Sequence, residues 1–298
     1  MPKIEYQKIK FQQKTLNLID KVNSVIDEYR VKGYSLTLRQ VYYQMVARAF
    51  IENTPKSYKN MGNIVNDARL AGLIDWEAIT DRTRSLSRYS SWQNPSSVIE
   101  SAAFSYELNR WQGQPCYVEV WEEKDALKEI VENGCCKTRT PFFSCRGYTS
   151  QSEMWEAARR FKSKVGRDCI IIHLGDHDPS GLDMTRDIQE RLQLFGATVK
   201  VHRIALTMAQ VQQYNPPPNP AKTTDTRFKQ YISQYGGESW ELDALEPDIL
   251  AGLIHNTITQ YLDMSKFNAV CQQEQEEKEE LYMLADRYHE AITCLRGA

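Results

Sequence analysis

The sequence predicts an α/β protein with an N-terminal helical winged-helix domain and a parallel α/β domain that continues into C-terminal helices. Two observations support this fold class. Between residues 117 and 204, short apolar runs alternate with helical patterns, which is typical of a parallel sheet with right-handed crossovers. Residues 11–84 carry instead three helical patterns followed by a basic tip, and helical patterns return after residue 247.

The composition is that of a globular chain with two domains. The chain has 298 residues, of which 41% are aliphatic or aromatic and 26% are charged. This length and balance are enough to bury a core and argue against a disordered protein. At about 100 to 200 residues per domain, we expect one domain over residues 1–110 and a second over residues 111–298.

The cysteines and the N-terminus predict a cytoplasmic protein. The seven cysteines are odd in number and contain no C-x-x-C pair, which argues against a disulfide framework or a zinc site. No apolar run approaches the roughly 18 residues that a membrane span needs. The polar start MPKIEYQKIK is not a signal peptide. We therefore expect reduced thiols and no membrane partner.

The charge is unevenly distributed, although the formal net charge is only −2. Residues 1–110 carry 16 Lys and Arg against 11 Asp and Glu, hence +5. The remainder carries 21 against 28, hence −7. A basic N-terminal part and an acidic C-terminal part predict that the first faces nucleic acid and that the second holds a metal ion.

The N-terminal patterns predict a helix–turn–helix with a wing. The first helix covers residues 11–30, the second runs from Leu38 to Phe50 after the N-cap Thr37, and the third covers residues 57–71. Apolar residues after Gly72, namely Leu73, Ile74, Trp76 and Ile79, would form short strands around the basic tip at residues 81–84. This order of elements is that of a winged helix.

The outer face of the third helix and the tip carry side chains that suit phosphates and base edges. The alternative is a small helical domain whose charges are only solvated, but such a face would normally carry more Glu. The candidate DNA-binding residues are Lys59, Asn63, Arg69, Arg82 and Arg84.

Two adjacent tyrosines in the second helix differ in their predicted orientation. At about 100° per residue, Tyr42 lies near the centre of the apolar stripe and Tyr43 points away from it, on the side of Arg39. A tyrosine beside a cation is a candidate nucleophile for a phosphodiester. The alternative is that Tyr43 is an ordinary amphipathic tyrosine, and Phe50 on the same side is compatible with a broad apolar face.

The second domain is predicted to begin after a linking helix at residues 95–111 and a hinge at 112–115. Strands and helices then alternate. The predicted strands cover residues 117–121, 142–145, 169–174 and 198–204, and the predicted helices cover 124–132, 150–162 and 182–194.

Carboxylates follow two of these strands directly. Asp176 and Asp178 come after the buried strand CIIIHL, and Glu123 follows the first strand. Ligands of parallel sheets bind beyond the C-terminal strand ends at a switch point, so the three acids would meet there if the two strands are neighbours. They would hold Mg²⁺, a hard cation that prefers oxygen ligands. The alternative is that Asp-x-Asp-Pro-Ser-Gly is only turn chemistry.

These motifs carry a resemblance to a known family. WEEKDAL at residues 121–127 and GDHDPSG at 175–181 resemble the Toprim domain of the topoisomerase VI A subunit and its meiotic double-strand-break relatives. LRQVYY at 38–43 resembles the catalytic-tyrosine segment of their winged-helix domain, and the order fits over roughly residues 35 to 205. Gln40 departs from the Asp usual there, and the chain resembles the short stand-alone members.

The resemblance implies roles for particular residues. Glu123, Asp176 and Asp178 match the metal-binding acids, Tyr43 matches the nucleophile, and Arg39 matches its neighbouring arginine. GYTS at 147–150 falls where the family has a similar glycine–tyrosine turn. In that family the tyrosine of one subunit meets the acids of another, which implies a homodimer. The chain carries no ATPase segment, so full strand passage would need a separate ATPase subunit or other partner.

The last third of the chain is less informative. Residues 216–227 would form an irregular loop that either reaches the site or lies on the surface. Glu241 and Asp243 would support the metal ligands or simply cap the region before a helix at 247–262. The charge run at 272–280 would be the solvated face of a helix.

The resulting functional hypothesis is a DNA-cleaving enzyme. One or two Mg²⁺ ions, or Mn²⁺ in their place, would polarise the phosphate of duplex DNA while Tyr43 attacks and forms a phosphotyrosine. Glu123 would then belong to the catalytic residues together with Tyr43 and Arg39. A first alternative is a Toprim nuclease in which metal-activated water attacks. A second is a non-catalytic winged-helix regulator.

Overall fold

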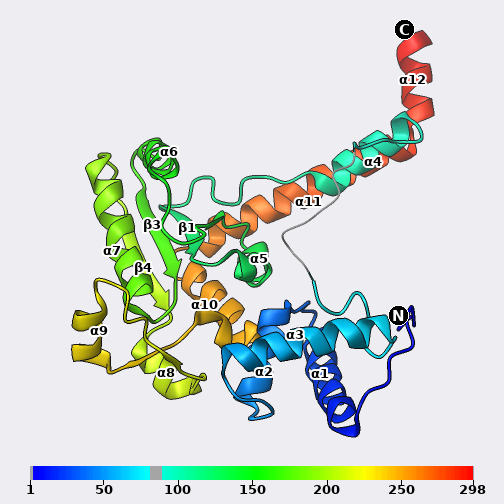
Figure 1. Ribbon diagram of the computed structural model, residues 1–298. Coiled ribbons are helices and arrows are strands. Elements are labelled where there is room, and N and C mark those ends of the chain that lie inside the picture. Colours follow the sequence, from blue (N-terminus) through cyan, green and yellow to red (C-terminus); the bar gives the residue numbers. More distant parts are fainter. Residues whose placement is uncertain (1–2, 81–88, 298) are drawn as a thin grey trace.

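A four-stranded parallel sheet with helices on both faces forms the larger part of the molecule (Figure 1). The computed structural model describes residues 3–80 and 89–297. The strand order is β2-β1-β3-β4, and all three neighbouring pairs are parallel. The α/β prediction is therefore confirmed for this part of the chain. The strands are β1 (Cys116–Glu122), β2 (Phe142–Ser144), β3 (Asp168–Leu174) and β4 (Lys200–Ala205).

Alternate residues of the two central strands build two separate cores. Val118 and Val120 of β1 and Ile170 and Ile172 of β3 face one cluster, whereas Trp121 of β1 and Ile171 of β3 face the other. Because both faces are covered, β3 has the continuous β-branched run typical of a buried parallel strand. The first face is covered by α5 (Lys128–Cys136) and α10 (Pro247–Thr259), and the second by α6 (Gln151–Lys162) and α7 (Pro179–Leu194).

The N-terminal part is a bundle of three helices around its own hydrophobic cluster. Thr37 caps the second helix with a capping box, as predicted, and Thr54 caps the third. Gly33 follows the first helix with φ of +83°, a conformation that favours glycine. The helices are α1 (Gln13–Val31), α2 (Leu38–Ala47) and α3 (Pro55–Leu70).

The segment after α3 differs from the predicted wing. Residues 71–80 contain bends, turns and two isolated bridges, Glu5 with Ala71 and Leu36 with Ile79, where short strands were expected. The physical reason is that Leu73 and Ile74 turn into the bundle, where each amide donates a hydrogen bond to the Ala68 carbonyl. The expected basic tip at residues 81–84 lies outside the described residues.

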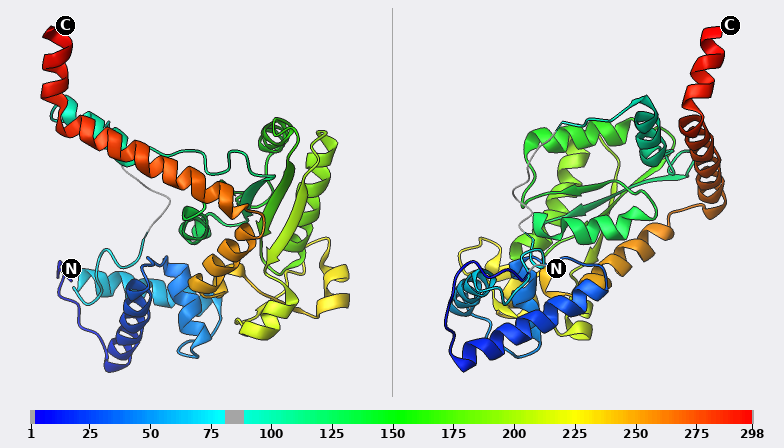
Figure 2. Two further views of the ribbon diagram at one scale, coloured as in Figure 1. Left: turned by 180° about the vertical axis from the view of Figure 1, so that it is seen from behind. Right: turned by 90° about the vertical axis from the view of Figure 1, so that its right-hand side faces the viewer.

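A helical arm extends away from the sheet (Figure 2). The linking helix is shorter than predicted, because it ends at Ser105, and it packs along the long C-terminal helix. The charge run at 272–280 is largely solvated, as expected, except for Glu274, which is buried and bonds to Arg110 at 2.9 Å. The arm consists of α4 (Pro95–Ser105), α11 (Met264–Asp286) and α12 (Tyr288–Gly297).

Short elements between β4 and α10 lie at the C-terminal end of the sheet. β5 and β6 pair antiparallel, and residues 242–244 form a 3₁₀ turn. Each of the seven cysteines is a free thiol. None of the described helices is long and apolar enough to cross a membrane. The remaining elements are η1 (Asp125–Leu127), α8 (Met208–Tyr214), β5 (Asn219–Pro220), α9 (Phe228–Tyr235), β6 (Glu238–Ser239) and η2 (Leu242–Ala244).

Candidate active site

The predicted acids meet at the switch point of the sheet. β1 and β3 are direct neighbours, and the chain leaves them toward opposite edges of the sheet. Glu123 follows β1, and Asp176 and Asp178 follow β3. The backbone amide of Asp176 donates to Oε2 of Glu123 over 2.9 Å. The expected adjacency of the two strands is confirmed, and it brings Glu123 into contact with Asp176.

The turn Asp176 to Gly181 is built differently from the expected loop. Asp178 is the N-cap of α7, and its Oδ1 accepts hydrogen bonds from the amide of Gly181 at 2.6 Å and the hydroxyl of Ser180 at 2.9 Å. Pro179 occupies the first helical turn, where a missing N–H does no harm. Residues 179–181 therefore belong to the helix, whereas the sequence predicted a turn before it.

Burial raises the pKa values of two of the acids, Glu123 and Asp176. The pKa of Glu123 is raised to about 7, first by burial and then by the charge of Asp176. The pKa of Asp176 is raised to about 6 by burial, against the opposing effect of Lys124. Burial is the first cause of both shifts, so the raised pKa values show that these carboxylates are held away from solvent, where their charged forms are disfavoured.

Arg203 of β4 fixes the backbone of this turn. Its Nη2 donates to the carbonyl oxygens of Gly175 at 2.8 Å and Asp176 at 2.6 Å, and its Nη1 donates to that of Gly181 at 2.9 Å. No pattern in the sequence predicts this role, because an arginine within a strand is ordinary. Its charge also faces Glu123 and the two aspartates, so it compensates part of their repulsion.

Lys124 and the segment after β6 complete the site, and the sequence prediction did not assign Lys124 to it. The Lys124 Nζ lies 2.9 Å from Asp176 Oδ2, 2.8 Å from Glu241 Oε2 and 3.2 Å from Asp243 Oδ1. Burial alone would lower the pKa of Lys124, but these three carboxylates raise it. Arg39 pairs with the same acids, at 2.6 Å from Glu241 and 3.4 Å from Asp243.

Tyr43 lies at the other end of this charged network. The Arg39 Cζ lies 5.8 Å from the centre of its ring. Burial and the charge of Asp243 raise the pKa of Tyr43 to about 12, and Arg39 opposes this effect. The ring lines a cavity of about 520 Å³ together with Tyr42, Tyr58 and the loop at residues 219–220.

The expected difference in burial between the two tyrosines is wrong. Tyr42 and Tyr43 are both 4% exposed and belong to one hydrophobic cluster. The reason is that Ala244 of η2 joins the same cluster and covers α2 from outside. Sequence periodicity within one helix carries no information about a segment 200 residues later that packs against it.

The candidate DNA-binding residues are dispersed. Lys59 and Asn63 are exposed on α3. Arg69 is half-buried, and its Nη2 donates to the carbonyls of Trp76 at 3.1 Å and Ile79 at 2.5 Å, so it holds the segment after α3. Arg82 and Arg84 lie outside the described residues.

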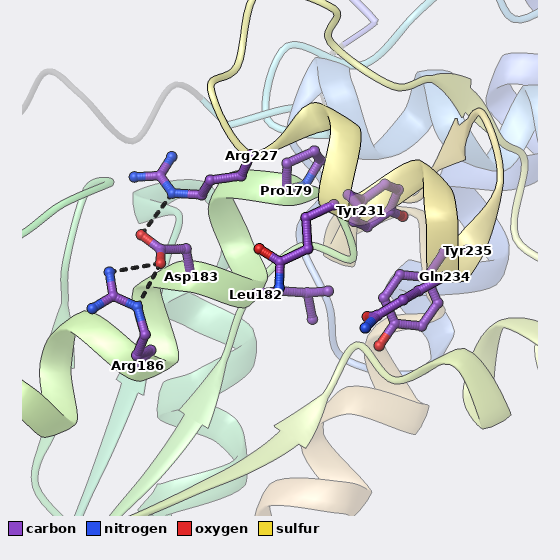
Figure 3. Close-up of a pocket in the computed structure, with 9 residues that line it drawn as sticks. Pro179, Leu182, Asp183, Arg186, Arg227, Tyr231, Gln234 and Tyr235 are labelled. Carbon is purple, nitrogen blue, oxygen red and sulfur yellow. Dashed lines mark hydrogen bonds and ion pairs between the residues drawn. The ribbon is translucent and has the colours of Figure 1, made fainter.

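A second cavity of about 360 Å³ opens between α7 and α9 (Figure 3). At its rim Asp183 pairs with Arg186 at 2.7 Å and with Arg227 at 2.9 Å. Its inner wall contains Tyr231, whose hydroxyl bonds to the buried His177. Arg186 also pairs with Glu190 and Arg227 with Asp225, so each charged side chain of this cavity already has a partner within the protein.

The three acids offer oxygen ligands of the kind that a divalent cation binds, but protein groups already bond to the oxygens of Asp176. Glu123, Asp176 and Asp178 supply hard oxygen ligands, which Mg²⁺ prefers. Among the described residues, no three His, Cys, Asp or Glu side chains are arranged to hold a metal ion. Asp176 explains this, since the Leu242 amide donates to its Oδ1 at 2.8 Å and the Lys124 ammonium to its Oδ2.

Comparisons with known proteins add no assignment. No protein-family model matches the chain, and neither the curated proteins nor the solved structures contain a match. The candidate function therefore depends on the geometry of the site.

Proposed function

We propose that the chain is a Mg²⁺-dependent enzyme that cleaves duplex DNA by tyrosine transesterification, as its resemblance to the topoisomerase VI A subunit and its relatives implies. One observation carries this proposal. A cation–π contact between Tyr43 and Arg39 and a continuous series of ion pairs from Arg39 through Glu241 and Lys124 join Tyr43 to Asp176. A candidate nucleophile and candidate metal-binding acids therefore belong to one site.

In the proposed reaction the Tyr43 oxygen forms a bond to phosphorus, and the bond from phosphorus to the leaving sugar oxygen breaks. The phenol loses its proton, and the leaving oxygen gains one. A pKa of about 12 disfavours phenolate at neutral pH, so the oxygen needs a neighbouring acceptor or cation. The charges of Glu241 and Arg39 both act on this hydroxyl, so Glu241 is the candidate proton acceptor and Arg39 the neighbouring cation.

The metal-binding residues proposed for this reaction are Glu123, Asp176 and Asp178. A divalent cation there would polarise the scissile phosphate and stabilise the leaving oxygen. The contribution of the chain itself is to fix these carboxylates, through the Arg203 contacts to the turn and the N-cap position of Asp178.

DNA would bind along the exposed face of α3, where Lys59 and Asn63 lie. Phosphate contacts from lysine position a duplex, and asparagine can bond to base edges. Arg69, Arg82 and Arg84 stay predictions of the sequence for this interface.

We further propose a cytoplasmic homodimer, and a separate ATPase subunit or other partner if the protein passes strands. The resemblance implies a tyrosine that meets the acids of the other copy, whereas Tyr43 is connected through Arg39 to Glu241 of its own chain, so in this proposal each copy cuts one strand. The arm offers exposed apolar side chains to a partner, among them Phe104 at 80% and Leu295 at 74% exposure.

A second candidate function is hydrolysis by metal-activated water, with Tyr43 only positioning DNA. The burial of Tyr43 at 4% exposure favours this alternative, because a buried phenol must be uncovered before it reaches a phosphate.

Tyr43→Phe separates the two functions. It keeps the ring but deletes the attacking oxygen, so cleavage and the covalent DNA adduct should both disappear while DNA binding persists. Tyr42→Phe is the control. It loses hydrogen bonds to Asn53 and the Thr54 carbonyl, each at 3.1 Å, and should lose about 1 kcal/mol of stability but no activity. Cleavage by Tyr43→Phe without an adduct would show that water is the nucleophile.

A further inference from the structure

The cavity beside Tyr43 is enclosed by segments that are distant in the sequence. Its volume is about 520 Å³, and its walls come from α2, the start of α3, the short strand β5 and Glu241. Cavities of roughly 300 to 1,000 Å³ with aromatic walls and a few placed polar groups are typical binding sites for small organic groups. The cavity therefore has the dimensions of a ligand site, and its lining gives the class of ligand.

Three tyrosine rings form one continuous aromatic surface in this cavity. The ring of Tyr42 makes edge-to-face contacts with the rings of Tyr43 and Tyr58, at 5.4 and 5.1 Å between ring centres. Tyr42 and Tyr43 are buried, whereas Tyr58 is 38% exposed and presents ring surface to a group that enters the cavity. Such a surface binds planar rings, and nucleobases of any sequence stack on it because each has a π-face.

The polar residues of the cavity are fixed by bonds within the protein. The Asn53 amide nitrogen donates to the Pro218 carbonyl at 2.7 Å and to Asn219 Oδ1 at 2.8 Å. Asn53 Oδ1 accepts a hydrogen bond from the Tyr42 hydroxyl at 3.1 Å. These bonds join the loop before α3 to β5 and hold the aromatic surface in place, so the cavity is preformed.

Arg39 provides the positive charge of the cavity lining. It pairs with Glu241 at 2.6 Å, yet its side chain is 48% exposed, so the guanidinium is accessible from solvent. Guanidinium groups bind phosphate through charge-assisted hydrogen bonds. An aromatic surface beside an accessible arginine suits a ligand that combines a planar ring with a phosphate, which is the composition of a nucleotide.

We infer that this cavity receives one unpaired nucleotide of the DNA strand that is cut, with its base stacked on Tyr58 and its phosphate beside Arg39. A duplex cannot enter a cavity of this volume, so the base has to leave the stack, and a base that is already unpaired enters at the lowest cost. The inference rests on the proposed DNA-cleaving function and adds the state of its substrate. It also bears on the burial of Tyr43, because a nucleotide in the cavity lies against the ring of that residue.

Two duplexes that differ in a single base test the inference. One carries a bulged adenosine and the other a bulged abasic nucleotide at the same position, and fluorescence anisotropy gives their affinities in EDTA, where the proposed metal-dependent cleavage cannot occur. The wild-type chain should bind the adenosine bulge more tightly by roughly fivefold or more, as expected for one base stacked on an aromatic side chain. Equal affinity for the two duplexes would overturn the inference.

Variants of Tyr58 locate the bound base. Tyr58→Leu keeps an apolar side chain but removes the π-face, so the preference for the adenosine bulge should disappear, whereas Tyr58→Phe should keep it. Tyr282→Leu, at an exposed tyrosine of the arm, is the matched control and should also keep the preference. A preference that persists in Tyr58→Leu would overturn the inference, because the base would then bind elsewhere.

Deoxyadenosine monophosphate provides a readout that needs neither cleavage nor duplex binding. In saturation-transfer NMR its base protons should receive saturation from the wild type and from Tyr282→Leu, and several-fold less from Tyr58→Leu. Mononucleotide binding without a preference between the two duplexes would identify a free nucleotide as the ligand and overturn the inference. DNA cleavage without this preference would refute the inference alone. A Tyr58-dependent preference in a protein that does not cleave DNA would refute only the proposed function, and loss of all DNA and mononucleotide binding would refute both.

Discussion

Gly181→Ala is expected to disrupt the acid-bearing turn, although alanine normally favours a helix. Gly181 lies in the first turn of α7, and a Cβ at this position would meet the Asp176 carbonyl oxygen at 2.3 Å. Ordinary contacts between carbon and its neighbours are about 3.5 Å or longer, so the overlap exceeds roughly 1 Å. The obstacle is backbone, and Arg203 holds it through a 2.6 Å hydrogen bond to the same oxygen. The turn must therefore open.

The expected change in the free energy of unfolding of Gly181→Ala is the sum of two opposing contributions. Overpacking of this kind typically destabilises by about 1 to 3 kcal/mol, and here the contact is shorter than in most such cases. Replacing glycine by alanine within a helix stabilises the folded state by up to about 1 kcal/mol. We expect a net loss of about 2 kcal/mol in the free energy of unfolding, measured by urea denaturation followed by circular dichroism.

Gly252→Ala is the matched control, because Gly252 lies inside α10 with nothing within 4 Å of its added Cβ. This variant should be more stable than wild type by about 0.5 to 1 kcal/mol. Gly181→Ala should also weaken Mn²⁺ binding, since Asp176 moves. A Gly181→Ala protein that unfolds at the same urea concentration as Gly252→Ala would refute the close approach between α7 and the turn.

Three further predictions concern charges. The effects of Arg39→Gln and Glu241→Gln on the free energy of unfolding should be non-additive, because the two side chains form an ion pair that is only partly exposed. A double-mutant cycle of urea denaturation should give a coupling free energy of about 1 kcal/mol. Additive effects would contradict the link between α2 and the residues preceding η2. Glu274 has a pKa lowered to about 2: burial raises it, but hydrogen bonds from an arginine, a backbone amide and a lysine outweigh burial. Its stabilising effect is therefore present above about pH 4.5 and lost as pH falls toward 2, so the stability gap between wild type and Glu274→Gln should close over that range. Lys59→Ala should lower the salt dependence of duplex-DNA binding by about one counter-ion in a fluorescence-anisotropy titration, whereas Lys137→Ala should not change it.

The sheet could be predicted because the residues that identify each strand are adjacent in the sequence. The β-branched run Ile170–Ile172 and the alternation with helical segments indicate a strand covered on both faces, whereas the pairing of β1 with β3 was only a condition of the prediction and is seen in the structure. The boundary of α7 was missed for a local reason too: Pro-Ser-Gly serves as a turn or as a first helical turn, and the N-cap hydrogen bond of Asp178 decides between them.

The parts of the site that the sequence did not predict depend on contacts between distant segments. Lys124 was part of a recognised motif, but its role depends on Glu241 and Asp243, which lie more than 100 residues later in the chain. No periodicity within either segment reports this pairing. Glu241 and Asp243 themselves were expected to support the metal ligands or to cap a turn, and only their distances to Lys124 and Arg39 show that they join the charged network.

The residues around η2 contact both parts of the proposed site, the acids after β3 and the tyrosine of α2. The amide of Leu242 holds Asp176, while Ala244 packs in the N-terminal cluster with Tyr43. A change at the acids, such as the binding of a cation, is therefore expected to reach α2 through this turn of three residues. Because Arg39 contacts both the Tyr43 ring and Glu241, a shift of Glu241 is expected to move Arg39 away from the phenol. Metal binding and exposure of the tyrosine are thus expected to occur together, which would couple the two events that cleavage requires.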